Sequence, residues 1–268
     1  MKYLVLGPAV MGAYAILGYL KHIESELENI KEISCSSSGC ITAFFMLLGY
    51  SIDEILDIYI KVPIAELTKI NIKNFLVNYG LVDTDGIGSF LRTFSKTEIT
   101  FASLYESTDV KLHVASYCMN TNKTVYFSVD TDPTLSVVQA ICMSISVPFL
   151  FGSIKYKGLH YLDGGTLECI PYSPFINKDS SDILTIKIQK SISASNFEIK
   201  SIKEYFVCLL KNLSDKITIS DNTSLKNTVT INLEDVNIFN FKMSHDEIFK
   251  IFLRGQQLAI LNHSGLTM

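Results

Sequence analysis

The stretch Cys35-Ser36-Ser37-Ser38-Gly39 separates a β-prone apolar run, Glu32–Cys35, from a helical pattern that begins at Gly39. Where a strand stops at small residues and passes directly into a helix, the turn between them can raise a serine hydroxyl above the backbone. The N-terminal end of the following helix favours negative charge beside that hydroxyl. We therefore take Ser37 as a candidate nucleophile, while a serine-rich helix N-cap is the simpler interpretation of the same residues.

A second segment, Tyr161-Leu162-Asp163-Gly164-Gly165, follows much later in the chain. Two glycines after an aspartate let the backbone turn tightly and approach another element closely, so they can bring the carboxylate to a serine that is distant in sequence. The alternative is an ordinary Asp-Gly turn at the end of a strand. Asp163 is the candidate general base for Ser37.

A third segment, Gly7-Pro8-Ala9-Val10-Met11-Gly12, lies between the first expected strand and the first expected helix. Such a loop can direct backbone N–H groups at a developing oxyanion. Pro8 has no N–H, whereas Ala9 retains one. Gly7 and Gly12 are equally consistent with a tight strand-to-helix turn that has no catalytic role.

Short β-prone runs alternate with helical patterns along the chain, which predicts an α/β fold with a mainly parallel central sheet. No long polar linker interrupts the 268 residues, of which 48% are apolar, so we expect residues 1–268 to form one domain. The expected strands are Lys2–Leu6, Glu32–Cys35, Lys111–Cys118, Thr124–Ser128, Ile183–Ile188 and Thr228–Leu233. The expected helices are Gly12–Leu27, Gly39–Leu48, Ile52–Ile60, Asp85–Phe94, Ser136–Ser144, Ser201–Leu213 and Ser244–Leu261.

Charge and cysteine content limit the partners and the compartment. The formal net charge is −4, and the Lys and Arg residues are scattered, which argues against a nucleic-acid surface. Six cysteines without CxxC spacing predict buried free thiols in a reducing, cytoplasmic environment.

The N-terminal run Tyr3–Leu20 contains no charged residue, and a membrane span or a signal peptide cleaved after Ala15 can be drawn there. Gly7-Pro8 and Gly12 interrupt the run. A strand, a glycine turn and a helix are the better interpretation, because proline and glycine break a continuous span.

The tetrapeptide Asp83-Thr84-Asp85-Gly86 begins like a calcium-binding loop. Ile87 occupies the next ligand position, however, and Phe94 stands in place of the bidentate acid. We expect neither a metal site nor a cofactor.

The order and spacing of the three segments resemble the patatin-like phospholipase family. Its members typically read Gly-Gly-Gly-x-Arg/Lys-Gly after the first strand, Gly-x-Ser-x-Gly after the second, and later Asp-Gly-Gly/Ala. The likeness covers nearly the whole chain, through Gly7–Gly12, Cys35–Gly39, Thr100–Tyr105, Val138–Pro148, Asp163–Gly165, Pro171 and Ser244–Glu247.

This resemblance implies a three-layer α/β/α patatin-like fold and hydrolysis of phospholipid or other lipid esters. Because the calcium loop is incomplete, we expect this hydrolysis to be calcium-independent, and we expect it to occur at a peripheral membrane surface. Ser37 would attack the ester carbonyl and become acylated, while Asp163 accepts the proton, so no histidine is needed. The resemblance also assigns the oxyanion loop to Gly7, Pro8, Ala9 and Gly12, and the elbow and its support to Cys35, Gly39, Gly164 and Gly165.

The chain departs from the family pattern at Pro8, at Met11 in place of the basic residue, and at Cys35 in place of the first elbow glycine. A catalytically weakened or inactive lipid-binding protein is therefore the main alternative. A membrane-anchored interaction protein, or a thiol enzyme using Cys35 or Cys40, is less favoured. Apolar runs at Phe44–Leu48, Phe149–Phe151 and Phe239–Phe241 can form either the mouth of a lipid site or ordinary core.

Overall fold

The structure, a computed structural model, describes residues 1–62, 64–68, 75, 79–95, 97–189, 205, 208 and 225–264. An eight-stranded sheet crosses this part of the chain in the order β5-β6-β3-β2-β1-β7-β8, and β4 also pairs with β3. Strands β3, β2, β1, β7 and β8 are adjacent in this order and pair parallel. Strands β4, β5 and β6 pair antiparallel with their neighbours. The strands are β1 (Tyr3–Leu6), β2 (Glu32–Ser36), β3 (Lys111–Cys118), β4 (Lys123–Phe127), β5 (Ile154–Tyr156), β6 (Leu159–Asp163), β7 (Ile183–Gln189) and β8 (Thr228–Asn232).

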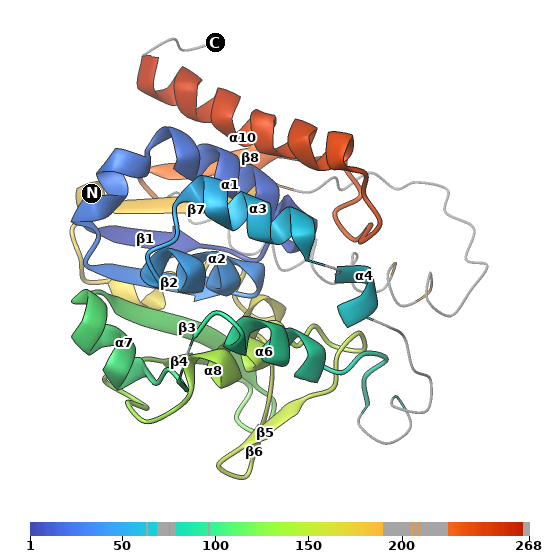
Figure 1. Cartoon of the computed structure of the whole chain (residues 1–268). Coiled ribbons are helices and arrows are strands. Elements are labelled where there is room, and N and C mark those ends of the chain that lie inside the picture. Colours follow the sequence, from blue (N-terminus) through green and yellow to red (C-terminus); the bar gives the residue numbers. More distant parts are fainter. Residues whose placement is uncertain are drawn as a thin grey trace.

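Figure 1 shows the strands arranged from β5 and β6 at the bottom to β8 at the top, with helices in front of them. Most of these helices begin or end at polar residues that satisfy free backbone groups. For example, α3 begins at a capping box formed by Ser51 and Glu54, and α7 at one formed by Thr100 and Ser103. The helices are α1 (Ala13–His22), α2 (Ser38–Leu47), α3 (Ile52–Lys61), α4 (Ile64–Leu67), α6 (Asp85–Arg92), α7 (Phe101–Thr108), α8 (Val137–Ser144) and α10 (His245–Ser264).

The two faces of the sheet carry cores of different size. Leu4, Leu6 and Ile33 point into the large core beneath the helices. Val5 and Ile183 point to the opposite face and pack against residues of the segment that follows β6, including Phe175. The sheet therefore lies between a thick helical layer and a thinner layer, within the residues that the structure describes.

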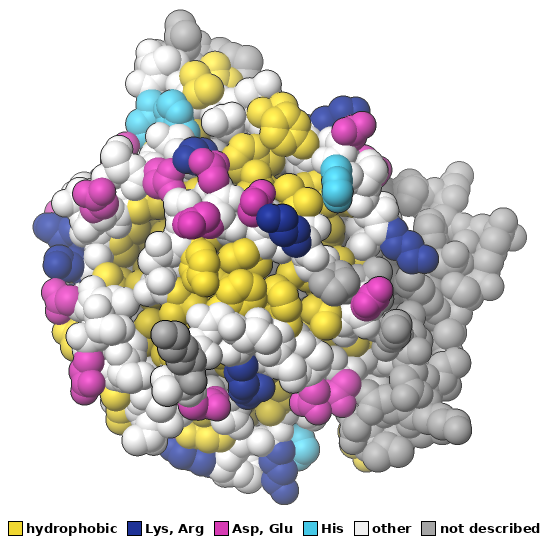
Figure 2. Space-filling model, in the orientation of Figure 1, with side chains coloured by type: hydrophobic (Ala, Val, Ile, Leu, Met, Phe, Trp, Pro, Cys, Tyr) yellow, Lys and Arg dark blue, Asp and Glu magenta, His cyan; other side chains and the backbone are white. Residues whose placement is uncertain are grey.

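The helix α2 runs directly beneath the surface seen in Figure 2, where apolar side chains gather in the middle of the face, between the positions of α3 and α6 in Figure 1. Its buried residues include Ala43, Phe44 and Phe45, and Met46 and Leu47 pack partly exposed against the same core. A helix that is apolar on nearly all sides is held by packing. This fixes the helix whose first turn follows Ser37.

Helix α10 crosses α1 at very short range. A Cβ placed on Gly18 of α1 would lie 1.9 Å from the carbonyl oxygen of Phe252, and one on Gly255 of α10 would lie 1.8 Å from that of Ala15. Only glycine at both positions allows the two backbones to come this close. The C-terminal helix thereby holds the helix that follows the Gly7–Gly12 loop.

The predicted α/β class and all six predicted strands are confirmed, with ends that differ by one residue or so. The helix expected over Gly12–Leu27 ends at His22 and continues as a 3₁₀ segment, Glu24–Asn29, because acidic side chains replace the apolar pattern there. Helices α4 and α7 and strand β5 were not predicted, and Ser201–Leu213 lies outside the described residues except for Tyr205 and Cys208. In the described part of the chain, no helix combines the length and the hydropathy needed to span a bilayer.

Candidate active site

Ser37 occupies the turn between β2 and α2 in a strained conformation. Its φ is 54° and its ψ is −132°, a region that residues with a side chain rarely adopt. The Ser37 side chain makes no capping hydrogen bond to α2, so the helix N-cap interpretation does not describe its hydroxyl. Gly39 allows the tight closure, because a Cβ there would lie 2.7 Å from the carbonyl oxygen of Leu6.

The ends of β2 and β6 meet on one edge of β3. Val114 and Ala115 pair with both β2 and β4, and Ser116 pairs with both β4 and β6, so β2 and β6 share the edge opposite β4. Ser36 pairs with Ala115, and Asp163 pairs with Ser116. Successive residues of a strand are about 3.3 Å apart, so the turn at Ser37 leaves the sheet at the point where Asp163 arrives.

The C-terminal end of α8 holds both segments in place. The N–H of Ser37 donates to the hydroxyl of Ser144 over 2.9 Å, and that hydroxyl donates to the carbonyl oxygen of Ala115 over 2.6 Å. The N–H of Asp163 donates to the carbonyl oxygen of Ser146 over 2.9 Å. Both serines are fully buried. The role of Ser144 is not evident from the sequence, although a polar residue in an apolar helix pattern indicates a buried group that needs a partner.

Two glycines set the path of the chain after Asp163. A Cβ on Gly164 would lie 2.4 Å from the carbonyl oxygen of Ala115, and one on Gly165 would lie 2.9 Å from Cγ of Pro8. The N–H of Gly165 donates to Oδ1 of Asp163 over 2.7 Å. Hydrogen bonds of this kind orient a carboxylate. The aspartate loop and the Gly7–Gly12 loop are therefore in contact, as the predicted site requires.

Most N–H groups of the Gly7–Gly12 loop already have acceptors. Gly7 donates to Ile186 over 3.2 Å, Met11 to Ile238 over 3.3 Å and Gly12 to Ala9 over 2.8 Å, each to a carbonyl oxygen. Ala9, which sequence analysis named as an oxyanion donor, donates to the hydroxyl oxygen of Ser38 over 3.1 Å.

The N–H groups of Val10 and Ser38 have no acceptor among the described residues. Val10 has a φ of 51°, a conformation that is strained for a β-branched residue. Neither the strain at Val10 nor the hydrogen bond of the Ser38 side chain has a local signal in the sequence.

An apolar cavity of about 140 Å³ opens beside Ser37 and Ser38. The other polar side chains in its wall are Tyr14 and Tyr59, whose hydroxyls bond to the carbonyl oxygen of Tyr59 and to Thr42. Burial raises the pKa of Tyr14 to about 12, so this tyrosine stays neutral. Most of the wall is formed by α1, α2, α4, α6 and the loops beside them, through Val10, Met11, Ala13, Ile41, Phe45, Val62, Ile64, Leu67, Ile87, Phe90, Leu91, Ile145, Val147, Leu150, Phe151, Phe239 and Phe241.

The three phenylalanine-containing runs noted in the sequence contribute in different ways. Phe45, Phe151 and Phe239 line the cavity, whereas Phe44 is fully buried in the core. Met11, which replaces a basic residue of the family pattern, also lines the cavity. No charged side chain belongs to the described cavity wall, and the space suits a hydrocarbon chain.

The cysteines next to the elbow have no features of a thiol nucleophile. Cys35 is fully buried, and burial together with the neighbouring Cys40 raises the pKa of its thiol well above the usual range. A thiol with a raised pKa is rarely a thiolate at neutral pH.

Asp83, in the calcium-like tetrapeptide, forms a local turn in which its Oδ1 accepts from the N–H of Asp85 over 3.0 Å.

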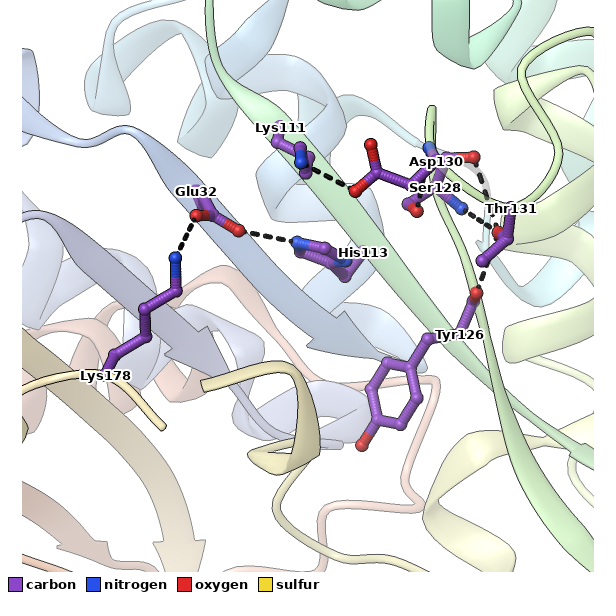
Figure 3. Close-up of polar contacts among 8 residues, drawn as sticks. All are labelled: Glu32, Lys111, His113, Tyr126, Ser128, Asp130, Thr131 and Lys178. Carbon is purple, nitrogen blue, oxygen red and sulfur yellow. Dashed lines mark hydrogen bonds and ion pairs between the residues drawn. The ribbon is translucent and has the colours of Figure 1, made fainter. Parts of the chain in front are cut away.

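The chain that follows Asp163 is anchored to the sheet by polar contacts (Figure 3). Glu32 accepts from Lys178 and bonds His113, each over 2.9 Å, and in Figure 3 its carboxylate lies between the two. The Ser34 hydroxyl donates to the carbonyl oxygen of Pro171 over 2.6 Å. These contacts are distant from Ser37 and stabilise the thinner layer.

The model of the patatin-like phospholipase family matches residues 4–176, which include all three segments. A probable lipid hydrolase of Invertebrate iridescent virus 6 is 28% identical over 195 residues, covering 68% of this chain and 67% of that protein. An uncharacterized protein of Acanthamoeba polyphaga mimivirus is 25% identical over 292 residues, covering 98% of this chain and 96% of that protein.

Two solved structures have the same fold. VipD from Legionella pneumophila superimposes with a TM-score of 0.68 at 15% identity, over 98% of this chain and 67% of that chain. ExoU from Pseudomonas aeruginosa, solved in complex with SpcU, gives a TM-score of 0.58 at 16% identity, over 99% of this chain and 52% of that chain. The chain therefore spans about half of the length of ExoU.

Proposed function

The chain belongs to the patatin-like phospholipase family, and from this premise we propose that it is a lipid acyl hydrolase in which Ser37 is the nucleophile and Asp163 the general base. One observation carries the proposal. The strained turn at Ser37 and the end of β6 at Asp163 meet on one edge of β3.

The proposed reaction has two halves. Asp163 accepts the Ser37 hydroxyl proton as the oxygen attacks the ester carbonyl, and the tetrahedral intermediate expels the alcohol, which takes the proton from Asp163. Water, deprotonated by Asp163, then attacks the acyl-enzyme, and Ser37 regains its proton as the fatty acid leaves. The N–H groups of Val10 and Ser38, which have no acceptor among the described residues, are the backbone donors available to the oxyanion.

The proposed substrate is a phospholipid or another lipid ester whose acyl chain enters the cavity beside Ser37. The apolar wall supports this assignment, since it offers a hydrocarbon chain contacts that it denies to charged groups. The name of the viral lipid hydrolase supports the same class of substrate. Phe149 precedes two cavity residues and is 37% exposed, which supports a peripheral contact with a membrane surface. The free cysteines support a reducing compartment, and we propose the cytoplasm.

Hydrolysis of p-nitrophenyl octanoate and of phosphatidylcholine vesicles tests the proposal. We expect activity in the parent protein with EDTA present, and loss of about 10³-fold or more in Ser37→Ala and Asp163→Asn. Circular dichroism and the melting temperature establish that both variants are folded. A fluorophosphonate should label the parent and leave Ser37→Ala unlabelled.

A lipid-binding protein without catalysis is the second candidate, because Pro8 has no N–H and that of Ala9 is already bonded to Ser38. It predicts that the parent hydrolyses neither substrate faster than Ser37→Ala. It also predicts that a fluorescent fatty acid still binds and is displaced by unlabelled fatty acid. This pair of results would reject the hydrolase proposal.

A further inference from the structure

The loop that faces the nucleophile is short of free donors. Pro8 has no N–H, and the N–H of Ala9 points to the side chain of Ser38, with 3.1 Å between the nitrogen and Oγ. If the Ser38 hydroxyl only occupied the N–H of Ala9, the site would lack two backbone donors, at Pro8 and at Ala9. It therefore matters which group accepts the proton of the Ser38 hydroxyl.

The hydroxyl of Ser38 is both an acceptor and a donor. Its oxygen accepts from Ala9, whereas its proton has no acceptor among the residues that the structure describes. Ser38 is half-buried and lines the same cavity as Ser37, where the rest of the wall is largely apolar. A hydroxyl that accepts a hydrogen bond becomes a stronger donor, because the two bonds polarise each other.

We propose that the Ser38 side-chain hydroxyl donates a hydrogen bond to the oxyanion formed when Ser37 attacks the substrate, in place of the N–H that Pro8 lacks. The inference rests on the proposed hydrolase function and adds a catalytic residue to it. Ser38 keeps its proton throughout, so the step involves no covalent change at this residue. Ala9 acts through Ser38, by holding the hydroxyl oxygen and leaving its proton available to another acceptor.

The proposal and a capping role predict opposite changes in the rate of Ser38→Ala. If Ser38 only caps Ala9, Ser38→Ala frees that N–H to bind the oxyanion itself, and the rate stays constant or increases. If Ser38 is the donor, its removal takes away a hydrogen bond to developing charge. Removing one such donor typically reduces kcat by about 10²–10³-fold.

The test compares the parent with Ser38→Ala, Ser38→Thr and, as a matched control, Ser107→Ala on α7. The Ser107 hydroxyl donates only to the carbonyl oxygen of Leu104 in its own helix. With p-nitrophenyl octanoate we expect kcat to fall about 10²-fold or more in Ser38→Ala, to stay within about 10-fold in Ser38→Thr, and to be unchanged in Ser107→Ala. Should Ser38→Ala fail to fold, Ser38→Cys replaces it, since a thiol is a weak donor of similar size.

A second readout separates the oxyanion role from a structural one. A long-chain trifluoromethyl ketone forms an oxyanion adduct with a serine nucleophile, and it should bind Ser38→Ala at least about 10-fold more weakly. The corresponding alkyl ether occupies the cavity without forming an oxyanion, and its affinity should not change.

Equal or higher kcat in folded Ser38→Ala, with an active parent, overturns this inference and leaves the Ser37–Asp163 proposal intact. An inactive parent that no fluorophosphonate labels overturns both.

Discussion

The backbone N–H of Ser37 donates to the side-chain hydroxyl of Ser144, which lies 107 residues later in the chain and 2.9 Å away. The same hydroxyl donates to the carbonyl oxygen of Ala115 on β3. It therefore stands where a direct bond between β2 and β3 would have continued the ladder. Through this bridge, the end of α8 fixes the strained turn that carries the proposed nucleophile.

Ser144→Ala should weaken both stability and activity. The substitution leaves the N–H of Ser37 and the carbonyl oxygen of Ala115 without this partner, and each unsatisfied buried group costs about 1–3 kcal/mol. We expect urea unfolding to give a loss of about 2–4 kcal/mol and ester hydrolysis to fall more than the folded fraction does. Ser146→Ala is the matched control, because its equally buried hydroxyl donates only to the carbonyl oxygen of Cys142, one turn away. Equal losses in the two variants would contradict the bridging role.

Gly164→Ala should disrupt the approach of Asp163 to β3. A Cβ at this position would lie 2.4 Å from the carbonyl oxygen of Ala115. The Cβ is fixed to one backbone and the oxygen belongs to the other, so one of the two segments has to move. Displacements of about 1 Å at a catalytic group can cost about 10²-fold in rate, and we expect at least this loss of kcat. Gly86→Ala on α6 should be tolerated, since its Cβ would meet nothing closer than 3.5 Å. Full activity in Gly164→Ala would mean that the β6 end is not the site of the base.

Local patterns predicted the two proposed catalytic residues because each stands in a short, recognisable context. Ser37 follows a strand that stops at small residues, and Asp163 precedes two glycines. The contacts that complete the site are not local. The hydrogen bond of Ser144 to Ser37 depends on where α8 ends in space, and the positive φ of Val10 contradicts the preference of a β-branched residue.

The cavity could not be predicted from the sequence. Phe45, Phe151 and Phe239 have the same apolar character whether they fill a core or surround a space. The volume depends on how α2, α4, α6 and the loops beside them are placed in space, which these residues do not encode locally. Strand β5 was not predicted, because three residues carry too little periodicity to identify an element.

Acidification should destabilise the protein through His113 and Glu32. Burial lowers the pKa of His113, against the opposing effect of Glu32. The unfolded chain therefore binds a proton at this histidine before the folded chain does, and stability falls as the pH drops below 6.5, the ordinary value. Burial acts to raise the pKa of Glu32, but hydrogen bonds from Lys178 and His113 hold it below its ordinary value of 4.5, so its contribution is lost at still lower pH.

We expect the melting temperature to fall between pH 7.5 and pH 5, and to fall less in His113→Gln. The variant should be less stable at pH 7.5, because the half-buried carboxylate of Glu32 loses one of its two partners. An unchanged slope in a folded His113→Gln would assign the pH dependence to other groups.

Thr185→Val should stabilise the fold. Thr185 lies on β7 and is fully buried, and its hydroxyl has no hydrogen-bond partner within the described residues. Valine keeps the branched shape and removes a polar group that burial penalises, so we expect a gain of about 1 kcal/mol in urea unfolding. Thr42→Val should have the opposite effect. The equally buried Thr42 hydroxyl lies 2.9 Å from that of Tyr59, so loss of this hydrogen bond should lower the free energy of unfolding by about 1–3 kcal/mol. The same sign in both variants would contradict this reasoning.

Ala13→Leu should change which acyl chains are hydrolysed and leave the chemistry intact. Ala13 opens α1, lines the cavity beside Ser37 and is 3% exposed, so three added carbons extend into the space proposed for the chain. Each methylene that fits or fails to fit an apolar pocket changes discrimination by about 10-fold or more. We expect kcat/KM for p-nitrophenyl octanoate to fall at least about 10-fold while that for p-nitrophenyl acetate stays within about twofold, since a short acyl group does not reach the filled space. The acetate ester is the internal control for folding and for the Ser37–Asp163 pair, and a parallel loss on both esters would show that the acyl chain binds elsewhere.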